Sequence, residues 1–306
     1  MRRTREVKIM QRKEAKTILS TQNGLNPYRT LTRGSLLDQG FDSGSMAETD
    51  YESVEAKINA PALLSFALRR KRNKCMIMAG SQSDPYQPCE QELKIMRGCL
   101  EEIDRHGFGI AIQTKSDLVL RDLDLLTSIN RKSRCIVQMT LMTVDEAVRV
   151  KLEPNVCTAA RRTEVLTELK KAGIPTIVRI APVLPFLNDS RKNIEALMEA
   201  CIGAGIYGLG FEPGVTVREK DRESFLTRLE ELFPGMRSAY EESFGTMPEM
   251  QSPEKAELLR YVRSACAGYH IEDDSGRLFT YLHAFVDREA GEQLSLFDIP
   301  VPAESV

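Results

Sequence analysis

Polar and charged side chains follow directly after the apolar runs in the middle of this 306-residue sequence. Ser83 lies in a loop of turn-forming residues after one such run, and Lys115 and Ser116 follow the next. A lysine at the end of a strand is a point charge suited to a carboxylate, although Lys115 could equally pair with Asp84 or Asp117. The two serines could be ordinary turn hydroxyls or ligand contacts. From these residues alone, a structural role and a ligand-binding role both stay open.

The following two apolar runs contain polar residues inside them. Gln138 and Thr140 lie in the run IVQMTL, and Arg179 lies in the run after it. Gln138 and Thr140 either contact a cofactor or hydrogen-bond each other in the interior. Histidines offer no competing metal site, because none of His106, His270 and His283 has a ligand spacing such as HExxH.

Alternating strand and helix patterns must position these side chains. Apolar runs bounded by Gly, Pro or polar residues predict strands at Cys75–Ala79, Phe108–Thr114, Cys135–Leu141, Pro175–Val183 and Ile206–Phe211, with an earlier candidate near Lys16–Ser20. Helical patterns predict helices at Ala60–Arg72, Gln91–Arg105, Asp122–Arg131, Arg161–Ala172, Lys192–Ala204 and Arg222–Leu232. Gly107, Gly173 and Gly205 lie where helices end.

Short connections between strands and helices predict a parallel sheet, because a helix must make each return crossing. A full or partial α/β barrel fits this pattern, and in such a barrel the chemistry gathers at the carboxyl ends of the strands. A doubly wound open sheet is the structural competitor, but no GxGxxG follows any predicted strand. We expect a basic arm at 1–15, a barrel core at 16–235, a helical cap at 236–286 and a flexible tail at 287–306.

Composition indicates a globular enzyme-like protein. Hydrophobic residues make up 42% and charged residues 28%, and 42 Lys and Arg nearly balance 44 Asp and Glu. This balance does not indicate nonspecific nucleic-acid binding, and DNA stays open as a partner. No apolar stretch is long enough for a membrane span or a signal sequence, so we expect a cytoplasmic protein. The 7 cysteines are dispersed, which favours small buried hydrophobes over disulfides.

Five strings occur in an order that resembles a known family. The strings are SDPYQP, TKSDLVLRDLDLL, VQMTL, PVLPFLND and GVTVRE. Together they resemble the spore photoproduct lyase-like branch of the radical S-adenosylmethionine superfamily, across about residues 14–300. The resemblance implies a partial (βα)6 barrel of the TIM type with a C-terminal helical cap. It also implies S-adenosylmethionine near Ser83, Lys115 and Ser116, a 4Fe-4S cluster, and reductive cleavage of the cofactor.

The resemblance breaks where the cluster should bind. Relatives have three cysteines directly after Asn-Pro-Tyr-Arg, whereas those positions fall here on Leu31, Ser35 and Asp38. Leucine has no ligand atom, and the oxygens of serine and aspartate are poorly suited to iron–sulfur ligation. Two explanations remain: the protein has lost the cluster, or a frame error in the coding sequence has altered about residues 30–50.

Lesion repair is a separate question from cofactor cleavage. In the spore enzyme a cysteine donates hydrogen near the cofactor, and by our alignment its position corresponds to about Ser81, a residue without a thiol. The resemblance therefore does not imply repair of a DNA lesion by this chain.

The C-terminal tail contains the peptide Gln293–Phe297, with the sequence QLSLF: Gln293, Leu294, Ser295, Leu296 and Phe297. It resembles the peptide by which bacterial DNA-maintenance proteins dock on the sliding clamp, although its apolar residues could also pack on the protein's own surface. Two function classes follow. One is a radical S-adenosylmethionine-type enzyme with impaired catalysis, and the other is an inactive cofactor-binding or docking module.

Overall fold

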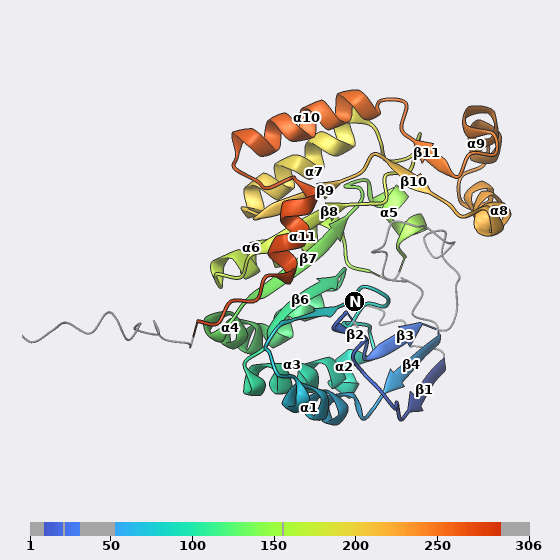
Figure 1. Cartoon of the computed structure of the whole chain (residues 1–306). Helices are drawn as coiled ribbons and strands as arrows, with labels where there is room; N and C mark the ends of the chain where they lie inside the picture. The colour runs from blue at the N-terminus through green and yellow to red at the C-terminus, as the bar shows by residue number, and fades with distance from the viewer. Residues whose placement is uncertain (1–8, 21, 31–52, 155, 289–306) are drawn as a thin grey trace, which may run out of the picture.

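The computed structural model describes residues 9–20, 22–30, 53–154 and 156–288. Its centre is a six-stranded parallel sheet of order β2-β5-β6-β7-β8-β9 (Figure 1). The strands are β2 (Gly24–Leu25), β5 (Met76–Ala79), β6 (Gly109–Thr114), β7 (Cys135–Leu141), β8 (Thr176–Ile180) and β9 (Gly208–Phe211). The predicted α/β class with a parallel sheet is confirmed.

The order of these strands across the sheet is the same as their order along the sequence. Each strand pairs with the next strand of the list, and the order does not reverse as it does in a doubly wound sheet. The doubly wound competitor is therefore wrong for this sheet. Closure into a partial barrel stays a prediction.

The first strand differs from the sequence prediction. Near Lys16–Ser20, Leu19 makes only an isolated antiparallel bridge to Leu25, and β2 is the segment that joins the sheet. The chain reverses through Asn23, whose φ is 61°, and the backbone carbonyl of Asn23 accepts a hydrogen bond from Met78. The prediction of a strand at Lys16–Ser20 was therefore wrong. It rested on an apolar run, which does not show where the chain reverses.

Helices cover one face of the sheet. They are α1 (Ala60–Arg70), α3 (Ile95–His106), α4 (Leu123–Lys132), α6 (Ala159–Lys171), α7 (Arg191–Ala204) and α10 (Lys255–Gly268). Alternate strand residues such as Ile112, Val137 and Val178 pack with them in the main core. Gly107 and Gly205 end α3 and α7 with φ values of 68° and 65°, as the sequence predicted.

A different helix covers the other face, here called the inner face. α11 (Ser275–His283) lies against the amino-terminal half of the strands (Figure 1), where Leu278 packs with Met76, Ile136 and Ile177. A Cβ atom at Gly208 would lie 2.4 Å from a methyl carbon of Leu278, so glycine makes this approach possible. The apolar half of the inner face is thus closed by α11.

Two smaller units flank the sheet. One is a three-stranded sheet of order β1-β4-β3, formed by β1 (Ile9–Lys13), β3 (Tyr28–Thr30) and β4 (Ser53–Lys57). The other has its own core and contains β10 (Gly214–Thr216), α8 (Arg222–Leu232), α9 (Met236–Phe244) and β11 (Glu249–Gln251). The short helices α2 (Glu90–Leu93) and α5 (Glu146–Leu152) complete the chain. Among the described residues, no helix combines the length and apolarity that a membrane span requires.

Candidate functional site

Lys115, directly after β6, belongs to a buried ion-pair cluster. Its Nζ lies 2.9 Å from Oε1 of Glu153, and Nη2 of Arg162 lies 2.7 Å from Oε2 of the same carboxylate. The three side chains are at most 2% exposed. Because two cations share one carboxylate, the cluster carries a net positive charge. Arg162 also donates to the backbone carbonyl of Thr140 at 2.8 Å, which holds this charge against β7.

The charge of Glu153 is stabilised by its partners. Burial alone would raise the pKa of this carboxyl, but the charges of Arg162 and Lys115 and their hydrogen bonds lower the pKa of Glu153 to about 2. Sequence reasoning had considered Asp84 and Asp117 as partners of Lys115, and the structure gives Glu153. Any ligand carboxylate must therefore approach a lysine that already has a buried partner.

Asp84 ties the loop after β5 to the end of β6. Its carboxylate accepts hydrogen bonds from the backbone N–H of Tyr86 at 2.8 Å, from the hydroxyl of Thr114 at 2.7 Å and from the backbone N–H of Lys115 at 2.9 Å. Burial raises the pKa of Asp84, and these hydrogen bonds oppose the shift. Asp84 therefore positions the two predicted binding loops against each other.

The two predicted serines have local structural contacts. The hydroxyl of Ser83, which is buried, accepts a hydrogen bond from the side-chain amide of Gln87 at 2.7 Å. The hydroxyl of Ser116 accepts one from the backbone N–H of Leu118 at 3.3 Å and caps the 3-10 helix η2 (Asp117–Asp122). These contacts give both serines a structural role in the loops, and their role toward a ligand stays a prediction.

Gln138 and Thr140 lie on the inner face, beyond the part that α11 covers. Gln138 is 7% exposed and Thr140 is 3% exposed. Within the described parts of the chain, neither side chain makes a hydrogen bond, either to the other or to a third residue. The alternative in which they satisfy each other is therefore not what the structure shows. Their polar atoms are not among the fully buried atoms without a partner, so they keep contact with solvent and have hydrogen-bonding capacity left for a ligand or water.

A second ion-pair network, which sequence reasoning missed, joins β3 and α2 to the string TKSDLVLRDLDLL. The carboxylate of Glu90, fully buried, accepts hydrogen bonds from the hydroxyl of Tyr28, from Arg121 at 2.6 Å and from the backbone N–H of Met96 at 2.9 Å. Arg121 also pairs with Asp122 at 2.7 Å. Tyr28 lies in β3, which leads into the segment where the resemblance places the cluster. The network thus anchors the entrance to that segment.

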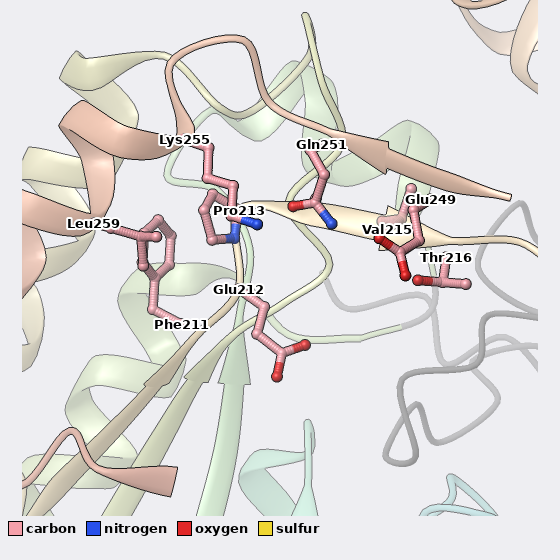
Figure 2. A pocket seen from close by; sticks show the side chains of 10 residues that line it. Phe211, Glu212, Pro213, Val215, Thr216, Glu249, Gln251, Lys255 and Leu259 are labelled. Carbon is pink, nitrogen blue, oxygen red and sulfur yellow. The ribbon is translucent and has the colours of Figure 1, made fainter. Parts of the chain in front are cut away.

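A surface groove of about 470 Å³ lies beyond the end of β9 (Figure 2). Its polar lining includes Glu212, Glu249, Gln251 and Lys255. In Figure 2 the carboxylate of Glu212 points away from Lys255 and toward the ends of the strands. Glu212 also lies close enough to Arg179 of the inner face to interact with it electrostatically.

Several predicted residues lie outside the described part of the chain. These are the positions Leu31, Ser35 and Asp38 and the tail peptide Gln293–Phe297. Five of the seven cysteines are buried, and Cys75 and Cys157 are partly buried. The described ranges contain no group of three or more His, Cys, Asp or Glu side chains that could hold a metal ion.

Comparison with known sequences gives relatives without a described function. No family model matches the chain. The chain is 28% identical over 228 residues to an uncharacterized protein of Mycobacterium tuberculosis, across 74% of this chain and 67% of that protein. It is 34% identical over 136 residues to an uncharacterized protein of Methanocaldococcus jannaschii, across 44% of this chain and 49% of that protein.

Solved structures give a likeness in fold. A mutant of spore photoproduct lyase superposes with a TM-score of 0.58 at 14% identity, across 85% of this chain and 79% of that chain. A second mutant, with bound AdoMet and dinucleoside spore photoproduct, gives 0.50 at 14% identity, across 72% and 66%. At 14% identity this likeness shows a shared fold. Function must still be argued from the site.

Proposed function

We propose that this protein binds S-adenosylmethionine at the carboxyl ends of β5, β6 and β7. The observation that supports this most directly is the pair Gln138 and Thr140, which are buried on the inner face without partners among the described residues. The fold adds support, because a spore photoproduct lyase mutant of similar fold was solved with bound AdoMet. Ser83, Lys115 and Ser116 complete the proposed site from the adjoining loops.

The chemistry of this edge suits a zwitterionic ligand. The cluster of Lys115, Glu153 and Arg162 has a net positive charge against β7, which favours a carboxylate nearby. The amide of Gln138 offers both a donor and an acceptor, and the hydroxyl of Thr140 does the same. These groups can orient a polar ligand without any change in the paired residues around them.

The residues of this chain do not fit the 4Fe-4S cluster that the superfamily implies. Such a cluster supplies the electron that cleaves S-adenosylmethionine and requires thiolate ligands, whereas Leu31, Ser35 and Asp38 occupy the aligned positions. We therefore propose cofactor binding without reductive cleavage.

Calorimetric titration of the full chain with S-adenosylmethionine tests the binding site. Thr140→Val removes the hydroxyl at nearly constant volume, and Thr163→Val is the matched control, because the Thr163 hydroxyl donates to Ala159 within α6. Loss of one hydrogen bond of about 1.4 kcal/mol weakens binding about tenfold. We expect this loss in Thr140→Val and unchanged affinity in Thr163→Val. Equal affinities for native protein and both variants would refute the proposed site.

Anaerobic reconstitution with iron and sulfide tests the absence of cleavage. We expect neither iron–sulfur absorbance nor 5′-deoxyadenosine after reduction in the presence of S-adenosylmethionine. Formation of both would show that other residues hold the cluster and that the protein is an active radical enzyme. Translation of the coding nucleotides in the other frames is the companion check, because a Cys-x-x-x-Cys-x-x-Cys reading would reveal a frame error.

Docking through the tail is the second candidate function, and the QLSLF sequence of Gln293–Phe297 is the observation that favours it. Apolar anchors on an extended peptide can bind a groove without a folded scaffold. We expect a peptide of residues 290–300 to bind a bacterial sliding clamp, and Leu296→Ala with Phe297→Ala to abolish binding. A native peptide that does not bind would eliminate this candidate.

A further inference from the structure

Arg179 is a cation on the inner face that neither the sequence comparison nor the proposed cofactor site assigns. It lies in β8, where the backbone register pairs it with Thr140 of β7 on one side and Gly210 of β9 on the other. These three residues form one row across the sheet, at the carboxyl end of the inner face. The row lies beyond the apolar half that α11 covers.

The guanidinium of Arg179 has no ion pair or hydrogen bond within the described parts of the chain, although the residue is partly buried. Its environment is unfavourable for a charge. Burial lowers the pKa of Arg179, and the nearby negative charge of Glu212 opposes this shift. A partly buried arginine elsewhere in the chain has ion-pair partners. Arg121 is bound to two carboxylates, Glu90 and Asp122.

The strand position next to Arg179 has room beside it among the described residues. A Cβ atom built at Gly210 would meet, of these residues, only the Cγ of Arg179 within 4 Å, at 3.7 Å. At Gly208, two residues earlier on the same strand, the corresponding atom would meet Leu278 at 2.4 Å. α11 therefore covers the inner face at Gly208 and does not reach Gly210, next to Arg179.

We propose that Arg179 binds an oxyanion, a phosphate or a carboxylate, of a second ligand that lies beside S-adenosylmethionine. This inference rests on the proposed function in that it places a substrate next to the cofactor. A guanidinium presents parallel N–H donors that match the two oxygens of such a group. Thr140, the neighbour of Arg179 in this row, belongs to the proposed cofactor site. The substrate class is thus an anionic molecule.

Chemical modification tests whether Arg179 is accessible. Phenylglyoxal reacts with guanidinium groups, and mass spectrometry of peptides reports each arginine separately. We expect Arg179 to react faster than Arg162, which is 2% exposed and ion-paired, and inorganic phosphate or acetate to protect it. Arg218 is the matched control because it is 43% exposed and already paired with Asp221, so neither anion should change its rate. Arg179 that reacts no faster than Arg162, or that neither anion protects, would overturn the proposal.

The two anions distinguish the source of the oxyanion. Protection by phosphate alone would indicate a phosphorylated ligand, and protection by acetate alone a carboxylic acid. Protection by both supports the shared chemistry. Arg179→Lys retains the positive charge but loses the paired N–H donors of the guanidinium. In a calorimetric titration it should bind the protecting anion about tenfold more weakly than native protein, a loss of about 1.4 kcal/mol.

The cofactor titration separates this inference from the proposed function. We expect Arg179→Met to lose phosphate binding, measured by calorimetric titration, and to leave S-adenosylmethionine affinity unchanged. A large loss of cofactor affinity in Arg179→Met would assign Arg179 to the cofactor and refute a separate subsite. If native protein does not bind S-adenosylmethionine while phosphate still protects Arg179, the proposed function fails and the anion site stands.

Discussion

The loops at the strand ends and the inner face differ in how completely their polar groups are paired. Around these loops, Lys115 and Arg162 share Glu153, and Arg121 binds Glu90 and Asp122. On the inner face, Gln138 and Thr140 have no partner among the described residues. Paired charges hold the loops in place, whereas unpaired polar groups retain capacity for a ligand. The difference separates residues that position the site from residues that can contact its occupant.

This difference changes the meaning of the family strings. The strings SDPYQP and TKSDLVLRDLDLL contain Asp84, Lys115 and Arg121, and each of these residues has a structural contact. Such a sequence string can therefore identify a fold because its residues hold the loops of that fold in place. Whether it also identifies the activity depends on groups that remain available.

The largest predicted effect is on Glu153. Glu153→Gln removes the carboxylate that Lys115 and Arg162 share, which leaves two buried cations without compensation. Breaking a buried ion pair typically costs about 3–5 kcal/mol, so we expect a loss of that size in urea unfolding. Glu164→Gln is the control, because Glu164 is 63% exposed and its pair with Arg161 contributes little. Loss of equal size in both variants would show that burial does not distinguish these pairs.

The pH dependence of stability sharpens the same point. Because the folded-state pKa of Glu153 is about 2 and lies below its ordinary value of 4.5, its stabilisation is fully present above pH 4.5. It is lost as the pH falls toward 2. The stability difference between native protein and Glu153→Gln should therefore shrink through this range. A difference that stays constant from pH 6 to pH 3 would contradict the assigned role of the carboxylate.

The network around Glu90 should show a smaller loss. Glu90→Gln weakens the charge-assisted hydrogen bonds from Arg121 and Tyr28, and bonds to charged groups contribute about 1.5–3 kcal/mol. We expect a loss in that range, measured by urea unfolding. A double-mutant cycle with Arg121→Met should reveal coupling between the two positions, and strictly additive losses would mean that the pair does not act as a unit.

The smallest effect on stability is expected at the inner face. Arg179→Met removes a partly buried charge that has no described partner, and Thr140→Val removes an unpaired hydroxyl. Replacing an unsatisfied polar group by an apolar group of similar shape is nearly neutral or stabilising. Thermal unfolding should place both variants within about 0.5 kcal/mol of native protein or above it. A loss as large as that of Glu153→Gln would mean that these residues also belong to the framework.

Much of the fold could be predicted because its signals are local. Apolar runs between turn residues located β5 through β9, and glycines located the ends of α3 and α7. β2 was misplaced because only Gly24 and Leu25 pair with β5, and a two-residue strand has no periodicity to detect. α11 is equally hard to place, since its position on the inner face depends on the contact of Leu278 with Gly208.

The site was less predictable because its contacts are distant in sequence. Lys115 and its partner Glu153 come from different loops, and no local spacing links them. Proximity in sequence suggested Asp84 and Asp117 instead. Arg179 stood out as a charge in an apolar strand, but its lack of a described partner becomes visible only when the neighbouring strands are in place.

Calorimetric titration of Gln138→Ala/Thr140→Val with S-adenosylmethionine tests the central claim most directly. The claim is that the unpaired polar groups of the inner face, and not only the paired loop residues, bind the ligand. The double variant should bind at least about tenfold more weakly than native protein, because each lost hydrogen bond contributes about 1 kcal/mol, and should retain native stability. Native affinity in the double variant would contradict the claim.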